Sequence, residues 1–307
     1  MEIIHKVNVR LWFKITRLTL KNLKKKILLA HSPDADDAFM FYALAKNIIK
    51  SENIEIEHIL KDIQTLNKEA EDLKYDVQAI SFFAYPELEK NYQLLSCGGS
   101  VGYGYGPLLV GKENITFQEL KEIKNPVIAI PGEKTTAYLL LKLLLKDFKS
   151  VVVPFDQILD QVSAGKYPFG LIIHEGQLSF EKAGLKKIVD LGEWWLSKTN
   201  LPVPLGGNVI KRSFLEKEKI EINTLIKKSI CYAIENKEKV VPEVASYARE
   251  LSDDHSLIDK FVGMYVNQFT VDYGSLGEIA IRKLYQMAYE DGLINKIPKL
   301  DFVQCQQ

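Results

Sequence analysis

Short, continuously apolar runs alternate with helical segments along this chain, and this alternation constrains the fold more than any other feature. The runs KKILLAH (25–31), VIAIPG (127–132) and GLIIHE (170–175) are rich in Ile, Val and Leu. Strands buried on both faces have this character, and they are typical of mostly parallel sheets flanked by helices. With 47% apolar residues in 307, the chain can bury a sizeable core. The sequence therefore predicts an α/β protein.

Two glycine- and proline-rich segments divide the chain. Residues 96–113 and 201–212 each pass from turn-forming residues into an apolar run, and a self-contained αβ alternation lies between them. We interpret this as two lobes, a large one formed by residues 26–110 plus 205–307 and a small one formed by residues 111–204. Ligands of such folds bind in the cleft, at the carboxyl ends of strands and the amino ends of helices.

The charge pattern excludes some classes of function. Forty Lys and Arg residues balance forty Asp and Glu residues, so no overall field attracts nucleic acid or an anionic membrane. A basic cluster occupies residues 1–25, where charges interrupt the apolar residues too often for a signal peptide or a membrane-spanning helix. We interpret this segment as an extension outside the core fold, in preference to an amphipathic surface helix.

The cysteines argue against a metal centre and against secretion. Cys97, Cys231 and Cys305 are far apart, and no CxxC pair exists. This usage disfavours a zinc knuckle, an iron–sulfur site or a disulfide scaffold. It predicts a cytoplasmic protein.

Two of the five histidines end strands of the buried type. His31 closes KILLAH and His174 lies in GLIIHE, so both are expected at the cleft, whereas His58 on an alternating strand is expected at the surface. An imidazole titrates near neutral pH and suits a general base. The alternative is a hydrogen-bonded structural histidine, which is the more common role for a lone histidine. Of the two, His174 is the stronger candidate.

Two turns are candidates for ligand contact. In IPGEKTTAYLLLKLLL a strand ends at Ile130, and Thr135 or Thr136 begins an apolar helix whose first N–H groups could bind a carboxylate. Simple capping by threonine is compatible with this interpretation. In SPDADD (32–37) the three acids match no cation-binding loop, so we favour helix capping over a metal. Residues 34–37 would repel a carboxylate and should meet hydroxyl groups instead.

Several strings resemble one enzyme family when taken together. They are HSPDADDAFMFYAL, DIQTLN, AISFFAY, GGSVGYGYGPLLV, PGEKTTAYLLL, GLIIHE, VDLGEWW and LPVPLGGNVI. Their order and spacing are similar to those of the 1,4-dihydroxy-6-naphthoate synthases of the futalosine route to menaquinone, over roughly residues 27–290. The sequence departs from the family at SPDADD, where relatives often read SPCPND.

The resemblance implies a type II periplasmic-binding-protein-like fold and a lyase. Its substrate would be cyclic dehypoxanthinyl futalosine and its product 1,4-dihydroxy-6-naphthoate, with release of a three-carbon fragment and with no cofactor or metal. The family's base carries over to His174. Its substrate contacts carry over to Ala79, Ile80 and chiefly Ser81, to Thr135, Thr136 and Ala137, and to Asn67.

The implied chemistry agrees with these residue types. Removal of a proton next to a ketone needs a base that titrates near the working pH, and the enolate needs fixed donors such as helix N–H groups. Two alternatives stay open. One is a chorismate dehydratase of the same pathway, disfavoured because GLIIHE places an imidazole where that enzyme usually has an acidic or small residue. The other is a solute-binding protein, disfavoured because no signal peptide or lipoprotein cysteine is seen. We expect a small-molecule substrate as the partner, with no nucleic acid and no membrane span.

Overall fold

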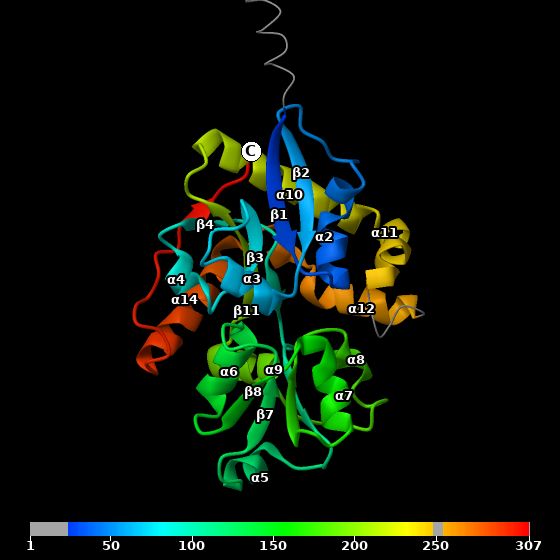
Figure 1. Ribbon diagram of the computed structural model, residues 1–307, viewed down its shortest axis with the longest axis vertical. Coiled ribbons are helices and arrows are strands. Elements are labelled where there is room, and N and C mark those ends of the chain that lie inside the picture. The colour runs from blue at the N-terminus through cyan, green and yellow to red at the C-terminus, as the bar shows by residue number, and fades with distance from the viewer. Residues whose placement is uncertain (1–23, 248–253, 307) are drawn as a thin grey trace, which may run out of the picture.

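Residues 24–247 and 254–306 are described by the computed structural model of this chain. Within these ranges the strands form two sheets, one above the other along the long axis of the molecule (Figure 1). We call the sheet that holds β1 and its covering helices the first lobe, and the other sheet with its helices the second lobe. Residues 1–23 of the predicted extension (1–25) lie outside the described residues.

In the described ranges, the first lobe contains a seven-stranded sheet. Six strands lie in the order β12-β4-β11-β3-β1-β2, and the seventh, β5, also pairs with β11. Its strands are β1 (Lys25–His31), β2 (Ile54–Leu60), β3 (Val77–Ser81), β4 (Tyr92–Leu95), β5 (Ser100–Gly102), β11 (Val203–Lys211) and β12 (Phe302–Val303). Its helices are α2 (Ala35–Ala45), α3 (Ile63–Glu69), α4 (Tyr85–Leu88), α10 (Glu216–Glu235), α11 (Lys237–Val244), α12 (His255–Tyr265), α13 (Gln268–Val271) and α14 (Gly274–Glu290).

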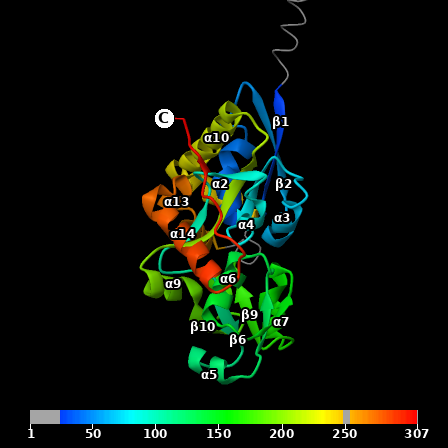
Figure 2. The same ribbon diagram turned by 90° about the vertical axis from the view of Figure 1, so that its left-hand side faces the viewer.

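Strand β1 is buried on both faces because helices cover both. Ile27 and Leu29 belong to the apolar cluster formed with α2 and α10, while Leu28 and Ala30 belong to the cluster formed with α3. Successive side chains of a strand point to opposite faces, which explains why the run is continuously apolar. The predicted strand KKILLAH is therefore confirmed. Figure 2 shows α3 beside β1 and β2, with α13 and α14 on the far side of the lobe.

The second lobe contains a five-stranded sheet in the described ranges, in the order β10-β6-β9-β7-β8. Its strands are β6 (Leu108–Gly111), β7 (Val127–Ile130), β8 (Lys149–Val152), β9 (Phe169–Ile172) and β10 (Lys186–Asp190). Its helices are α5 (Phe117–Glu122), α6 (Thr136–Leu144), α7 (Ile158–Ser163), α8 (Gly176–Ser179) and α9 (Leu191–Thr199). Strand β9 ends at Ile172, so His174 lies just beyond it and before α8.

The sheets are mixed, which corrects the prediction of mostly parallel sheets. β11 runs antiparallel to β3, β4 and β5, and β6 runs antiparallel to β9 and β10. β1, β2 and β3 are parallel, as are β7, β8 and β9. The antiparallel strands adjoin the two passages of the chain between the lobes. Continuous apolar runs report burial on both faces, and they do not report strand direction.

The passages between the lobes lie close to the predicted boundaries without coinciding with them. β6 begins at Leu108 and belongs to the second sheet, so a boundary at residue 110 cuts this strand; β11 begins at Val203 in the first sheet. One apolar cluster continues across the two lobes and includes Leu140 of α6 and Leu284 of α14. No helix in the described ranges is long and apolar enough to cross a membrane.

Candidate functional site

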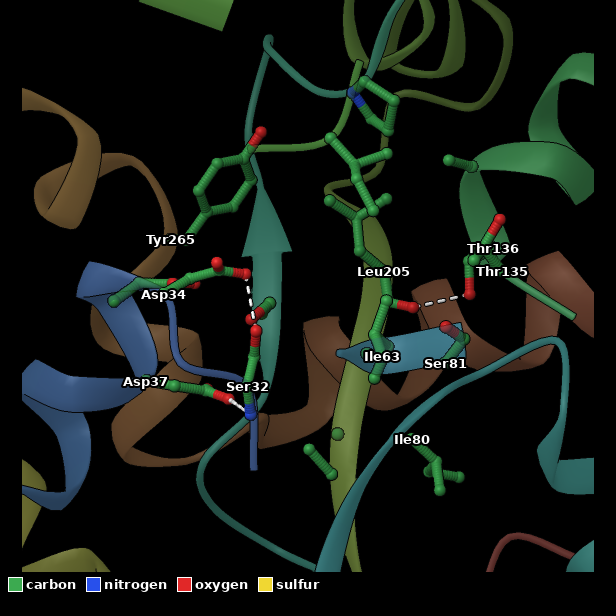
Figure 3. A pocket seen from close by; sticks show the side chains of 18 of the residues that line it. Ser32, Asp34, Asp37, Ile63, Ile80, Ser81, Thr135, Thr136, Leu205 and Tyr265 are labelled. Carbon is green, nitrogen blue, oxygen red and sulfur yellow. Dashed lines mark hydrogen bonds between the residues drawn. The ribbon is translucent and has the colours of Figure 1, made fainter. Parts of the chain in front are cut away.

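A cavity lies between the two lobes, at the ends of strands and helices from both. Figure 3 shows Thr135, Thr136 and Ser81 on one side of it, and Ser32, Asp34, Asp37 and Tyr265 on the other. The remaining lining residues are Asp36, Ile63, Ala79, Ile80, Gly98, Ser100, Pro107, Ala137, Ile173, Leu205, Gly206 and Gly207. The cavity thus has a hydroxyl-rich end and an acidic end.

The amino end of α6 forms part of the hydroxyl-rich end. Thr135 is the N-cap, and its Oγ1 accepts a hydrogen bond from the N–H of Tyr138 at 3.3 Å and donates to the carbonyl of Gly132 at 2.8 Å. The N–H groups of Thr136 and Ala137, in the first turn, have no acceptor within the helix. These N–H groups carry partial positive charge and suit a carboxylate or a developing oxyanion.

The hydroxyl of Thr136 joins the two lobes. Its Oγ1 donates to the carbonyl of Leu205 at 2.5 Å and accepts from the N–H of Phe83 at 3.2 Å. Both partners belong to the first lobe, whereas Thr136 belongs to the second. The hydroxyl of Thr136 is thus engaged as both donor and acceptor, which leaves its backbone N–H as the donor that this residue can offer at the amino end of α6.

Ser81 is held in place by Asn67 of α3. The Asn67 side chain accepts from the N–H of Ser81 at 2.8 Å and donates to Ser81 Oγ at 3.0 Å. Ser81 lines the cavity, and its Oγ, which accepts from Asn67, still carries a proton of its own. Asn67 itself is 1% exposed and is not among the lining residues. Its place is behind Ser81.

The acidic end is built by Ser32–Asp37, which we call the acidic turn. The N–H of Ser32 donates to Asp37 Oδ2 at 2.6 Å, and Ser32 Oγ donates to Asp34 Oδ2 at 2.6 Å. Asp34 occupies the N-cap position of α2, but its side chain makes no capping hydrogen bond, so the capping interpretation is wrong for this residue. Asp34 bends back to Ser32 instead. Asp36 and Asp37 lie in the first turn, where the helix dipole favours acids as expected. The described residues contain no group of three His, Cys, Asp or Glu residues suited to a metal.

Two carboxyls of the acidic turn, those of Asp36 and Asp37, resist ionisation. Burial, followed by the charge of Asp34, raises the pKa of Asp36. Burial, followed by the charge of Asp36, raises the pKa of Asp37 well above its usual range. Because protonated carboxyls donate as well as accept, this end of the cavity can hydrogen-bond with the hydroxyls of a ligand.

His31 lies behind the acidic turn and is not a cavity residue. Its Nδ1 donates to the carbonyl of Ser32 at 2.9 Å, so its Nε2 accepts from Nδ1 of His58 at 3.0 Å. Burial, followed by the charge of His58, lowers the pKa of His31 to about 3. His31 is therefore neutral and structural, and His58, expected at the surface, is half-buried as its partner.

His174 is held inside the second lobe by both ring nitrogens. Nδ1 accepts from the N–H of Gly176 at 3.0 Å, and Nε2 donates to the carbonyl of Phe155 at 3.0 Å. The side chain is 4% exposed, and it borders a separate hollow beside Phe155 and Lys182 instead of the cavity between the lobes. Its neighbour Ile173 does line that cavity.

The structure adds residues that the sequence did not indicate. Tyr265 lines the cavity from α12, and its hydroxyl donates to Gln177 Oε1 at 2.7 Å. No local pattern distinguishes Tyr265 from the other aromatic residues of its helix. Leu205, Gly206 and Gly207 also line the cavity, and the proline- and glycine-rich string LPVPLGG was their available signal.

Two solved structures similar to this chain confirm the predicted fold. A protein of Archaeoglobus fulgidus is 43% identical with a TM-score of 0.82, over 88% of this chain and 98% of that one. A periplasmic sulfonate-binding protein of Methylobacillus flagellatus is 18% identical with a TM-score of 0.60, over 90% of each chain. The chain is thus folded like the periplasmic binding proteins.

Sequence comparison identifies the family. Two relatives named 1,4-dihydroxy-6-naphthoate synthase match most of the chain. The one from Thermus thermophilus is 36% identical over 90% of this chain and 98% of its own. The one from Streptomyces coelicolor is 34% identical over 87% and 94%. A family described by its role in menaquinone biosynthesis matches residues 27–290. The chain therefore belongs to this menaquinone-biosynthesis family.

Proposed function

We propose that this protein is a 1,4-dihydroxy-6-naphthoate synthase, a lyase that converts cyclic dehypoxanthinyl futalosine to 1,4-dihydroxy-6-naphthoate and releases a three-carbon fragment. The name shared by two relatives over about nine-tenths of this chain supports the activity. The observation that carries the proposal is the two-ended cavity, with donors at one end and carboxyls at the other. The substrate has matching ends, a benzoate and a sugar-derived ring.

The two ends give the substrate one favoured orientation. We place the benzoate at the amino end of α6, where the N–H groups of Thr136 and Ala137 and the hydroxyl of Ser81 can donate to it. We place the sugar-derived ring against the acidic turn, whose carboxyls can accept from hydroxyls and donate to them. The reverse orientation would bring the benzoate against three acidic side chains.

We propose His174 as the general base that removes the proton next to the ketone. A neutral imidazole suits this step, and the ring follows directly on Ile173 of the cavity wall. Nδ1 carries a lone pair, which now accepts from Gly176. To act as the base, Nδ1 must therefore give up the hydrogen bond from the Gly176 N–H and face the substrate proton when the cavity is filled.

The remaining steps follow from the enolate. Loss of the proton leaves an electron pair on the ketone fragment, and fixed donors at the cavity wall stabilise the resulting oxyanion. Elimination then breaks the bond to the three-carbon fragment, which leaves with the bonding electron pair and takes up the proton that the base removed. Aromatisation of the new ring favours the product. Closure of the lobes over the bound substrate would exclude water from the enolate. Each of these steps uses only the substrate and the side chains named above. We also propose that the enzyme acts in the cytoplasm.

One assay separates this activity from its alternatives. The purified full-length protein is mixed with cyclic dehypoxanthinyl futalosine, and the naphthoate chromophore is followed by absorbance and mass spectrometry. A parallel reaction contains chorismate. We expect naphthoate from the first and no change in the second. Dehydration of chorismate would identify the sister enzyme, and tight binding of substrate without turnover would identify a solute-binding protein.

A further inference from the structure

Cys97 and Cys305 lie just beyond the ends of two neighbouring strands of the first lobe. β12 pairs in parallel with β4, with Val303 opposite Leu95 (Figure 1). The two segments stay together one residue further, since the N–H of Ser96 donates to the carbonyl of Val303 at 3.2 Å. Each cysteine follows two residues after one member of the Leu95–Val303 pair. Alternate residues of a strand point to the same face, so both thiols belong on the face of that pair.

The packing agrees with this register. Leu95, Val303 and Cys97 belong to one apolar cluster, and Cys305 packs against it. Cys97 is 0% exposed, whereas Cys305 is half-buried, and both are free thiols. Neighbouring strands lie about 4.8 Å apart, and disulfides join Cα atoms about 4.4–6.8 Å apart. Opposite positions on adjacent strands are therefore within reach of a disulfide.

The side chain of Asn223 in α10 connects the two thiols. The Cys97 thiol donates to Asn223 Oδ1 at 3.1 Å, and Asn223 Nδ2 donates to Ser96 Oγ at 3.0 Å. Ser96 Oγ in turn lies 3.8 Å from Cys305 Sγ. Asn223 is 0% exposed, so these contacts are made inside the lobe. They bring the two sulfur atoms to one small region between β4, β12 and α10.

The two thiols differ in reactivity. Burial raises the pKa of the Cys97 thiol well above its usual range. The neighbouring Cys97 thiol, followed by Ser96 and the charge of Lys227, lowers the pKa of Cys305 to about 7, although burial opposes this shift. The thiolate is the nucleophilic form of cysteine. Cys305 is thus suited to attack an oxidant, and Cys97 is suited to react with the product.

We propose that Cys97 and Cys305 are a redox-sensitive pair that closes to a disulfide when the protein meets hydrogen peroxide. The Cys305 thiolate attacks one peroxide oxygen and becomes a sulfenic acid, and the hydroxide released takes up the proton that Cys305 had lost. The Cys97 sulfur then attacks the Cys305 sulfur, and the sulfenic oxygen leaves as water with the Cys97 proton. Two thiols and one peroxide thus give one disulfide and two waters, and a dithiol reverses the change.

The disulfide would tie the C-terminal segment to the wall of the cavity. Gly98 directly follows Cys97 and lines the cavity, and its carbonyl accepts from Asn208 Nδ2 at 2.8 Å. The bond would also close residues 97–305 into one covalent loop, which restricts the unfolded chain. Oxidation is therefore expected to stabilise the folded protein. The inference concerns the thiols and does not rest on the proposed function.

Peptide mapping tests the pairing. The full-length protein is reduced with dithiothreitol, desalted and exposed to hydrogen peroxide, and the remaining thiols are blocked with N-ethylmaleimide before digestion. We expect mass spectrometry to find a Cys97–Cys305 peptide pair that disappears on renewed reduction. Cys231→Ser, half-buried on α10, is the matched control and should form the same pair. Linkage of Cys305 to Cys231, or oxidation of Cys305 to a sulfinic acid without linkage, would overturn the proposal.

Urea unfolding tests the consequence for stability. We expect a higher urea midpoint for the oxidised wild-type protein than for the reduced one, and a single midpoint for Cys305→Ser under both conditions. An equal increase in Cys305→Ser would contradict the proposal. If this variant does not fold, the wild-type protein alone must show the mapped pair and a reversible shift of the midpoint together. Neither measurement uses the substrate, so failure of the naphthoate assay would refute the proposed function and leave this inference standing.

Discussion

Asn67 makes two hydrogen bonds to Ser81: its Oδ1 accepts from the backbone N–H at 2.8 Å, and its Nδ2 donates to the side-chain oxygen at 3.0 Å. This pairing fixes the direction in which the serine hydroxyl can donate. It also satisfies polar groups that burial would otherwise leave unpaired, because Asn67 is 1% exposed and Ser81 is 4% exposed. Asn67, implied by the resemblance as a substrate contact, thus lies where it orients Ser81, which lines the cavity.

Replacement of Asn67 by alanine should reduce both stability and substrate affinity. The buried N–H of Ser81 loses its acceptor, which costs about 1–3 kcal/mol in the free energy of unfolding. The loosened hydroxyl should raise KM more than it lowers kcat. Urea denaturation and steady-state kinetics measure the two effects. Asn91→Ala, at an exposed site, should change stability by no more than about 0.5 kcal/mol. Equal stability of Asn67→Ala and Asn91→Ala would contradict the pairing.

Removal of the helix cap at Thr135 should destabilise the second lobe. Its hydroxyl accepts from the N–H of Tyr138, and loss of such a cap costs about 1 kcal/mol. We expect Thr135→Val to show this loss by thermal unfolding and to bind the naphthoate product more weakly. Thr135→Ser keeps the oxygen and should restore most of both. If valine and serine variants behave alike, the hydroxyl is not the relevant group.

The strands were the most predictable part of the fold, because burial on both faces leaves a continuous apolar pattern. The predicted strand at 25–31 coincides with β1. The strand predicted around His58, which alternates instead, is β2. Side-chain partners were less predictable. The alternation of IEIEHIL suggested that His58 faces solvent, yet β2 lies beside β1 and brings this ring to His31. That contact depends on strand register between distant segments, which no local pattern encodes.

The candidate site also contains residues that the sequence indicated and residues that it did not. Ala79, Ile80 and Ser81 and the start of α6 line the cavity, since strand ends and helix starts converge at sheet edges. Tyr265 reaches the cavity from a helix far along the chain. The side chain of Asp34 does not cap α2, because its carboxyl accepts a hydrogen bond from the hydroxyl of Ser32 instead.

Acidification should remove stability through His31. Its folded-state pKa, about 3, lies below the ordinary value of about 6.5, so the unfolded chain takes up the proton first. This contribution is fully present above pH 6.5 and is lost as the pH falls toward 3. The loss is at most about 1.4 kcal/mol per pH unit for one group. Urea unfolding at pH 7 and pH 4.5 should show a larger loss for the wild type than for His31→Gln. Equal losses would mean that His31 titrates normally.

Replacement of His174 by asparagine should abolish turnover and spare binding. Loss of a general base lowers kcat by about 10²–10⁴-fold, while the cavity contacts from α6 and Ser81 remain. Because the ring also accepts from Gly176 and donates to Phe155, the variant loses some stability, and kcat must be referred to the folded fraction measured by circular dichroism. His255→Asn, at an exposed helix start, is the matched control and should keep full activity. Product affinity, measured by calorimetry, should be unchanged in both variants. Near-normal kcat in His174→Asn would leave the ring a purely structural role, fixed between two backbone groups, and would transfer the search for the base to the carboxyls at the acidic end of the cavity.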